Sequence, residues 1–303
     1  MKDRNNRIYR AGCPHHLYLK ALEGNVLFYK TEDYLFFLTL LYVLAKRYGI
    51  RVEAVCIMFN HSHIFISPVP QDVFEAFLRD LQAIFAKRYN EEYHHQGPLM
   101  MPGGYAPKGS HKSTISCLIY ILNNPVAGRL VHNAADYKWN MLAYQMSEHP
   151  FSERLVKRES RSRMRRALQL VDVCFNQGKY LSYSIQKQIF RGLTPLEKKQ
   201  TVDYIVNKYY PLAKDVINKR FGNYETATIA LNASTGSEHD MYEPWEDYSV
   251  YAKMLRSTMS SRLDHHNFRF HEMDADDLVE LTHLLLGTPG ATSLHLKRFL
   301  HMA

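Results

Sequence analysis

Residues 56–67 read CIMFNHSHIFIS, a mostly apolar run that contains two histidines two positions apart. Its β-branched and aromatic residues are typical of a β-strand. Because successive side chains of a strand point to opposite faces, His61 and His63 share one face and Ser62 faces the other way. Two imidazoles side by side on a rigid backbone suit the binding of one divalent metal ion.

A second informative stretch follows at residues 116–125, which read SCLIYILNNP. On a helix, Tyr120 and Asn124 are i,i+4 neighbours and share one face. A phenol is a weak nucleophile near neutral pH, since its pKa is about 10, and it needs a metal or a base to attack phosphorus. A histidine pair facing a tyrosine and an amide indicates a metal-assisted tyrosine nuclease. The plainer interpretation of Tyr120 is an aromatic core residue, because most of its neighbours are apolar.

The first half of the chain alternates strands and helices. Strands are predicted at 15–21, 50–57 and 61–67, and helices at 31–48 and 71–93. Residues 97–109 are rich in glycine and proline, and we expect a loop with a short strand there. A helix over 112–124, ended by Pro125, carries Tyr120. The order βαββαβα predicts an α+β, ferredoxin-like (split βαβ) domain with an antiparallel sheet.

The chain has 303 residues, a formal net charge of +8 and a pI of about 9.1. This length suits two domains, and the positive charge favours a polyanionic partner. The cysteines are scattered without a CxxC pair, which argues against a zinc ribbon or a disulfide framework and favours a reducing compartment. No signal peptide or apolar run of membrane-spanning length is visible, so we expect a cytoplasmic protein that does not bind membranes.

The sequence changes character after residue 150, which predicts a first domain of residues 1–150 and a mostly helical accessory domain of residues 151–303. The second domain begins with a dense basic cluster, which fits contact with phosphate groups or else a solvated helix face. The members of this basic cluster are Arg154, Lys157, Arg158, Arg161, Arg163, Arg165 and Arg166.

Further helices are expected over 195–233, broken near Pro211 and Gly222, and over 247–263, with a polar loop at 234–246 between them. Two last helices, at 274–287 and 293–302, are separated by a short turn. This pair fits a DNA-binding helix-turn-helix that presents Lys297 and Arg298, although helix packing alone also explains its leucines.

Three blocks of the sequence, in this order and spacing, resemble the Y1 transposases of the IS200 type, and most closely their REP-associated tyrosine transposase relatives. The blocks are residues 58–63 (MFNHSH), 120–131 (YILNNPVAGRLV) and 135–140 (ADYKWN). The relatives are HUH endonucleases, named for histidine–hydrophobic–histidine. Two positions depart from the family pattern: Ser62 stands where a hydrophobic residue is usual, and Phe59 where a proline is usual.

The resemblance implies a site and a reaction. It makes His61, His63 and Asn124 the three protein ligands of Mg²⁺ or Mn²⁺, which orients the scissile phosphate. It makes Tyr120 the nucleophile, which forms a covalent 5′-phosphotyrosine and leaves a free 3′-OH. The substrate it implies is single-stranded or hairpin DNA, bound by a monomer or a homodimer.

Two other functions stay open. A domesticated, cleavage-dead DNA-binding protein of the same fold is favoured by the departures at Ser62 and Phe59. A ferredoxin-like RNA-binding module is expected to show exposed aromatic residues in an RNP-type pattern, and the sequence has no such pattern. The adjacent histidines at 15–16, 94–95 and 265–266 carry little weight as metal ligands, because neighbouring residues of a strand face opposite ways.

Overall fold

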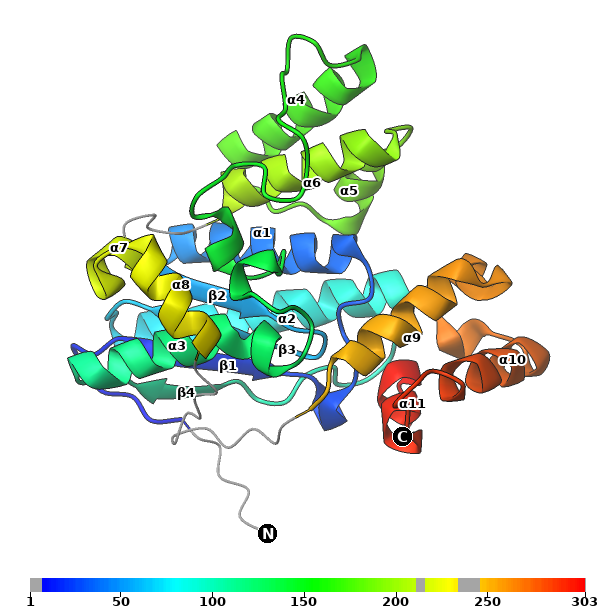
Figure 1. The fold of residues 1–303 in the computed structure, drawn as a ribbon, viewed down its shortest axis with the longest axis horizontal. Helices are drawn as coiled ribbons and strands as arrows, with labels where there is room; N and C mark the ends of the chain where they lie inside the picture. The colour runs from blue at the N-terminus through cyan, green and yellow to red at the C-terminus, as the bar shows by residue number, and fades with distance from the viewer. Residues whose placement is uncertain (1–6, 211–215, 234–245, 303) are drawn as a thin grey trace.

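The computed structural model describes residues 7–210, 216–233 and 246–302. Its centre is an antiparallel sheet with the strand order β2-β3-β1-β4 (Figure 1). The strands are β1 (His15–Lys20), β2 (Val52–Ile57), β3 (His61–Ile66) and β4 (Gly104–Pro107). The turn between β2 and β3 is tight, because the N–H of Met58 donates to the carbonyl of His61. In the strand order given above, β3 lies inside the sheet, between β2 and β1.

Different helices cover the two faces of the sheet. The helices of the first half are α1 (Thr31–Arg47), α2 (Gln71–Tyr93) and α3 (His111–Ala127). α1 and α2 pack together, with the rings of Phe36 and Phe85 stacked 5.6 Å apart. α2 also lies against the sheet, because the side chains of Leu19 from β1 and Leu78 from α2 both lie beside Gly103. α3 packs against β2 and β3 from the other side (Figure 1). The predicted ferredoxin-like α+β plan is confirmed.

α3 is longer than predicted. Its N-cap is Ser110, whose hydroxyl accepts a backbone N–H of the first turn, and the helix continues past Pro125, where the sequence predicts its end. A proline disturbs a helix because it lacks an N–H, but in the last turn few intrahelical bonds follow it. The N–H of Gly128 donates to the carbonyl of Asn124 and closes the helix.

The second half is helical. Its helices are α4 (Ser162–Asn176), α5 (Tyr183–Phe190), α6 (Pro195–Tyr209), α7 (Val216–Phe221), α8 (Tyr224–Ala233), α9 (Ser249–Ser260), α10 (Ala275–Leu286) and α11 (Ser293–Leu300). Short 3₁₀ turns lie at Leu22–Gly24, Ala134–Asp136, Met141–Tyr144, Arg262–His266 and Phe270–Glu272. The predicted break near Gly222 is confirmed, whereas Pro211 and most of the predicted loop at 234–246 lie outside the described residues.

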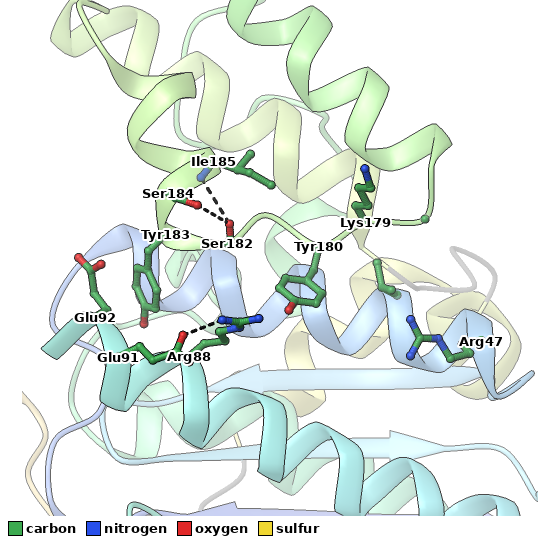
Figure 2. A pocket seen from close by; sticks show the side chains of 12 residues that line it. Arg47, Arg88, Glu91, Glu92, Lys179, Tyr180, Ser182, Tyr183, Ser184 and Ile185 are labelled. Carbon is green, nitrogen blue, oxygen red and sulfur yellow. Dashed lines mark hydrogen bonds and ion pairs between the residues drawn. The ribbon is translucent and has the colours of Figure 1, made fainter. Parts of the chain in front are cut away.

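These helices are distributed around the first half of the chain. α4, α5 and α6 lie above α1, α7 and α8 lie near α3, and α9 to α11 lie at one end of the sheet (Figure 1). α11 contacts the first half directly, since the N–H of Val26 donates to the carbonyl of Arg298. Beside α5, a cavity of about 520 Å³ remains between α1, α2 and the segment that leads into α5 (Figure 2). The division into domains at residue 150 stays a prediction.

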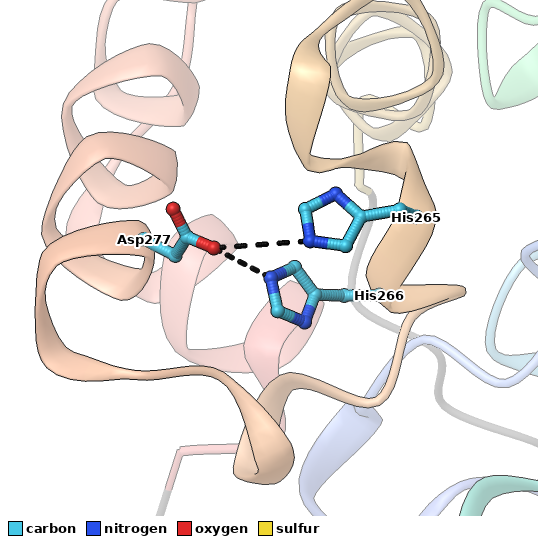
Figure 3. A group of neighbouring side chains, drawn as sticks. All are labelled: His265, His266 and Asp277. Atoms are coloured by element: carbon cyan, nitrogen blue, oxygen red, sulfur yellow. Dashed lines mark hydrogen bonds and ion pairs between the residues drawn. The ribbon is translucent and has the colours of Figure 1, made fainter.

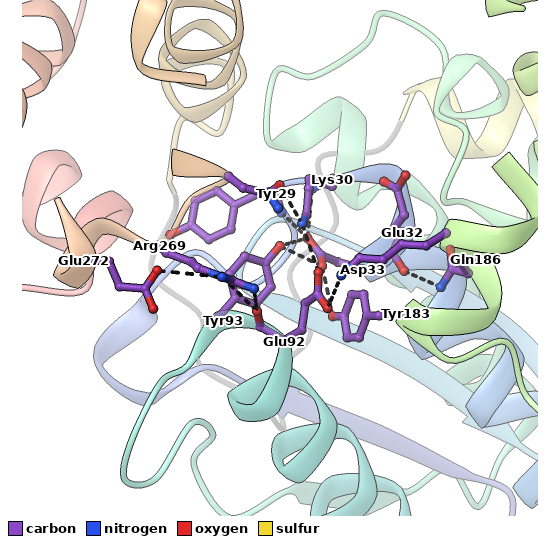
Figure 4. A network of polar contacts seen from close by, with 12 residues as sticks. Tyr29, Lys30, Glu32, Asp33, Glu92, Tyr93, Tyr183, Gln186, Arg269 and Glu272 are labelled. Atoms are coloured by element: carbon purple, nitrogen blue, oxygen red, sulfur yellow. Dashed lines mark hydrogen bonds and ion pairs between the residues drawn. The ribbon is translucent and has the colours of Figure 1, made fainter. Parts of the chain in front are cut away.

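A buried carboxylate joins three of the helices. Asp33, in the first turn of α1, is fully buried and accepts the hydroxyl of Tyr93 from α2 at 2.9 Å and that of Tyr183 from α5 at 3.0 Å (Figure 4). It also accepts the backbone N–H groups of Tyr29 and Lys30. Burial raises the pKa of Asp33 to about 6. The carboxylate thus ties α5 of the second half to α1 and α2 of the first half.

No helix within the described part of the chain is both long enough and apolar enough to span a membrane.

Candidate active site

His61 and His63 lie side by side on one face of β3, as their spacing predicts. Both are fully buried, and their ring centroids are 4.8 Å apart with an interplanar angle of 78°. His63 lies opposite Tyr18 of β1 in the antiparallel pairing. The ring of Tyr120 lies 5.2 Å from that of His63. The histidine face of the sheet is therefore the face that α3 covers.

Asn60 fixes the protonation of His61. Its side-chain N–H donates to the carbonyl of Gly24 at 3.0 Å, which turns its Oδ1 toward Nδ1 of His61 at 2.6 Å. An amide oxygen only accepts hydrogen bonds, so His61 carries its proton on Nδ1 and its lone pair on Nε2. Metal-binding histidines have this arrangement, in which one nitrogen donates to an oxygen and the other can bind the ion.

His63 has partners at both ring nitrogens. Nε2 of His16, from β1, lies 3.0 Å from Nδ1 of His63. The side-chain amide of Asn124, from α3, lies 3.1 Å from Nε2 of His63. When Nε2 of His16 accepts a hydrogen bond from the Nδ1–H group of His63, the lone pair of His63 is on Nε2 and points toward Asn124. His16 then orients His63 as Asn60 orients His61.

The donor set fits a divalent cation that prefers nitrogen and oxygen ligands. The separation of 3.1 Å between His63 and the Asn124 amide is close to that of neighbouring donors around an octahedral ion with bonds of about 2.1 Å. A half-turn of the amide exchanges its nitrogen for its oxygen at nearly the same position. One imidazole and an amide oxygen can therefore bind one ion, with the His61 ring 4.8 Å from that of His63, and Mg²⁺ and Mn²⁺ are compatible with such donors.

Tyr120 lies on the side of α3 that faces the histidines. Its half-buried ring makes edge contacts with His63, at 5.2 Å and 79°, and with His16, at 6.0 Å and 66°. Asn124 follows four positions later on the same face, as the i,i+4 spacing predicts. The structure thus brings together the four residues singled out in the sequence, namely His61, His63, Tyr120 and Asn124.

Other residues at this site have no clear signal in the sequence. His16 belongs to the adjacent pair at residues 15–16, which carries little weight as a pair of metal ligands because neighbouring strand residues face opposite ways. The same geometry nevertheless requires one histidine of the pair to face α3. Tyr18 stacks on His63 at 5.1 Å, and Cys56 of β2 lies opposite His63. Tyr248, just before α9, is buried, and its hydroxyl lies 3.4 Å from Nδ1 of His61. Tyr248 could be found only from the folded chain.

Three side chains that commonly bind metals gather elsewhere. His265 and His266, in the turn Arg262–His266, both face Asp277 of α10 (Figure 3), and their potential ligand atoms lie within 4.8 Å of one another. The expectation that adjacent histidines diverge rests on strand geometry, and it fails in this 3₁₀ turn, where the rings lie 4.0 Å apart. Asp277 already has partners at both oxygens, at 2.6 Å from His266 and 2.9 Å from Arg262. Ion pairing therefore accounts for this group.

The predicted basic cluster lies on and just before α4, on the far side of α1 from the sheet (Figure 1). All seven side chains are exposed. Two of them form contacts within this helical region: Arg161 donates to Glu197 of α6 at 2.7 Å, and Lys157 lies 3.3 Å from Asp172 of α4 and donates to the hydroxyl of Tyr204 of α6 at 2.7 Å. DNA binding by the cluster stays a prediction.

The predicted helix-turn-helix residues lie on α11. Lys297 is exposed, whereas Arg298 donates to Glu246 at 2.7 Å and to the carbonyl of Glu23 at 3.1 Å. Arg298 therefore helps to hold α11 against the first half of the chain. A role for either residue in DNA binding stays a prediction.

Residues 15–108 match the family model described as "Transposase IS200 like". This segment runs from β1 to β4 and includes the histidine pair, so this part of the chain is similar to IS200-like (Y1) transposases. A solved structure described as a REP-associated tyrosine transposase bound to a REP hairpin is similar with a TM-score of 0.41 and 15% identity, covering 48% of this chain and 85% of that one. That likeness is too distant to assign individual residues. No curated protein matches the chain.

Proposed function

We propose that this protein is a transposase-like endonuclease and strand transferase that acts on single-stranded DNA through a 5′-phosphotyrosine at Tyr120. One observation carries the proposal: α3 lays Tyr120 and Asn124 against His63 of β3, and the ring of His61 lies 4.8 Å from that of His63. The match of residues 15–108 to IS200-like transposases supports it.

In this reaction the hydroxyl oxygen of Tyr120 attacks the scissile phosphorus. The bond between phosphorus and the 3′ oxygen of the preceding nucleotide breaks, the phenol loses its proton, and the 3′ oxygen gains one. His61, His63 and Asn124 would hold a divalent ion, Mg²⁺ or Mn²⁺, which supplies Lewis-acid polarisation of the phosphate. Because the phosphotyrosine keeps a phosphate ester, a later hydroxyl can displace Tyr120 and rejoin DNA without ATP.

The proposed substrate is single-stranded or hairpin DNA. Attack on one chosen strand needs an accessible phosphate and unpaired bases, and the net charge of +8 suits a polyanion. Within the accessory region proposed for residues 151–303, the side chains of Arg154, Arg158 and Arg166 are exposed and form no ion pair with any described residue. They are the members of the basic cluster best placed to contact the DNA backbone.

Tyr120 lies beside the histidines of its own chain. We therefore propose that a single chain contains a complete site, so that a monomer is sufficient for cleavage, although a homodimer is compatible with the same arrangement.

The direct test uses hairpin oligonucleotides labelled at the 3′ end, with Mg²⁺ or Mn²⁺, analysed on a denaturing gel. The label should migrate with the protein, because the 5′ phosphate of the 3′ fragment becomes attached to Tyr120. A label at the 5′ end should instead appear on a free fragment that ends in 3′-OH. Tyr120→Phe and His63→Ala should abolish the adduct, whereas Tyr18→Phe, a matched change on the same face, should retain it.

Tight, salt-sensitive DNA binding without an adduct across varied hairpins would contradict the nuclease. It would instead support the alternative, a cleavage-dead DNA-binding protein of the same fold.

A further inference from the structure

A cavity of about 730 Å³ lies beside the turn that joins β2 to β3, and Phe59 of this turn lines it. It lies between the start of α1, the turn before β3, the segment 137–139, α6 and α9. Its volume falls within the range of ligand pockets, about 300–1,000 Å³. None of the proposed metal ligands lines it, nor does Tyr120.

The cavity wall is fixed to the strand pair that carries the histidines. Phe59, two positions before His61, lines the cavity, and its carbonyl accepts two backbone N–H groups from the segment before α1. On the opposite side, Tyr137 donates its hydroxyl to the carbonyl of Ile57 at 2.9 Å, and the N–H of Ile57 donates to the carbonyl of Trp139 at 3.0 Å. The cavity is therefore held next to the end of β2 and the start of β3.

Aromatic rings form much of the wall. Trp139 is half-buried and stacks on Tyr34 with ring centroids 4.4 Å apart and an interplanar angle of 5°. Both rings line the cavity together with Phe59. Stacked aromatic side chains are the surfaces on which proteins hold unpaired bases, because every base has a π face.

Lysines supply a positive charge at the same place. Lys138, Lys198 and Lys199 line the cavity, and neither Lys198 nor Lys199 forms an ion pair with any described residue. Burial lowers the pKa of Lys138, and the neighbouring charge of Lys199 lowers it further, against the opposing effect of Asp203. Asp203 is occupied by other donors, namely the hydroxyl of Tyr144 and the N–H of Phe151. Because Lys138 and Lys199 line the same cavity and their like charges interact, an anion bound there would relieve their repulsion.

We propose that this cavity binds the unpaired nucleotides next to the scissile phosphate, with a base against the Trp139–Tyr34 pair and phosphates at Lys138 and Lys199. The proposal rests on the proposed function and adds a subsite to it. Two acidic residues, Glu32 and Asp264, also line the cavity, but the lysines outnumber them. The mixture of aromatic rings and cations fits single-stranded nucleic acid better than an apolar ligand.

Tryptophan fluorescence can report on the cavity directly. Trp139 and Trp245 are the two tryptophans of the chain, so a Trp245→Phe background leaves Trp139 as the sole reporter. A hairpin DNA carrying a single-stranded extension should quench its fluorescence, whereas the blunt hairpin should not. This readout changes no residue of the cavity.

Affinity supplies the second readout. The double variant Lys138→Gln/Lys199→Gln should lose about ten-fold or more in affinity for the extended hairpin and little for the blunt one. The variant Lys46→Gln/Lys87→Gln is the matched control, since it removes two exposed lysines that do not line the cavity. Equal losses in the two double variants, or no quenching by the extension, would overturn the proposal.

Adduct formation, measured on the same oligonucleotides, separates this proposal from the nuclease itself. Quenching and selective loss of affinity without an adduct would retain the cavity as a DNA subsite and reject cleavage. An adduct without quenching would retain the nuclease and reject the subsite. Stronger quenching and tighter binding by an RNA version of the extended strand would overturn the assignment to DNA.

Discussion

At the scale of single residues, Asn60 has a defined role in the candidate metal centre. It forces the His61 proton onto Nδ1, because its own N–H is committed to the carbonyl of Gly24. The variant Asn60→Ala removes this orientation, and we expect the affinity for Mn²⁺ to fall about 10- to 100-fold. Isothermal titration calorimetry of the protein with Mn²⁺ measures this affinity. Unchanged affinity would show that Asn60 does not orient a metal ligand.

Ser62 is the matched control for that experiment and gives a prediction of its own. It points away from the histidine face, opposite Leu19 of β1, and its buried hydroxyl has no hydrogen-bond partner among the described residues. A buried hydroxyl without a partner is destabilising. Ser62→Ala should therefore raise the free energy of unfolding by about 1 kcal/mol and leave the Mn²⁺ affinity unchanged. Chemical denaturation would contradict this if the variant proved less stable.

Sequence periodicity predicts part of this site and not the rest. The shared face of His61 and His63, and that of Tyr120 and Asn124, follow from the period of one strand and of one helix. His16 requires knowledge of which strand pairs with β3. Tyr248 enters from a segment far along the chain, and no local pattern reports such a contact.

At the scale of elements, the start of α9 is fitted closely to the end of α3. A methyl group on Gly128 would lie 2.7 Å from Cδ2 of Tyr248, and the N–H of Tyr248 donates to the carbonyl of Gly128 at 3.1 Å. Gly128→Ala should therefore cost about 1–3 kcal/mol of stability through steric overlap. In a Tyr248→Ala background this cost should largely disappear, because the clashing ring is absent.

Gly287→Ala is the control for this double-mutant comparison of Gly128 and Tyr248. Gly287 also follows a helix and has a negative φ of −71°, but its added methyl group would meet atoms no closer than 3.4 Å. Its stability should change by less than about 0.5 kcal/mol. A Gly128→Ala cost that is the same with and without Tyr248 would contradict the packing described here.

Most strands and helices could be predicted, because each has a clear period and a clear boundary. α2 begins and ends at the predicted residues. α3 extends past Pro125 because tertiary contacts can stabilise a last helical turn that local sequence signals predict to be absent. α5 has no counterpart among the predicted elements, since an eight-residue helix depends mainly on its packing, here including the bond from Tyr183 to Asp33.

At the scale of the whole molecule, Asp33 couples stability to pH. Its pKa is raised from 3.8 to about 6, mainly by burial, so the folded state holds a proton that the unfolded state releases. The contribution of Asp33 to stability should therefore be largest below pH 4 and should fall as the pH rises through 6, by about 2–3 kcal/mol.

The difference in the free energy of unfolding between the wild type and the Asp33→Asn variant isolates this contribution, because the other carboxylates titrate in both proteins. Denaturation at a series of pH values from 4 to 7 should show the wild type losing stability relative to the variant as the pH rises. A difference that is independent of pH would show that Asp33 has the same pKa in both states.

Net charge predicts the class of partner but not where it binds. The sequence suggests that the basic cluster forms one surface, yet Arg161 forms an ion pair with Glu197 of α6 and Lys157 forms one with Asp172 of α4. The lysines of the 730 Å³ cavity come from separate segments, and only the fold brings Lys138 near Lys199. The sequence could therefore predict a polyanion as partner and could not locate this cavity.

The central claim is that Tyr120 is the nucleophile of a single-strand DNA endonuclease. The most direct test is to isolate the covalent adduct formed with hairpin DNA and Mn²⁺, digest it, and locate the nucleotide-bearing peptide by mass spectrometry. The modification should lie on Tyr120 alone. Modification of Tyr18 or Tyr248, which also lie against the histidines, or the absence of any adduct, would contradict the claim.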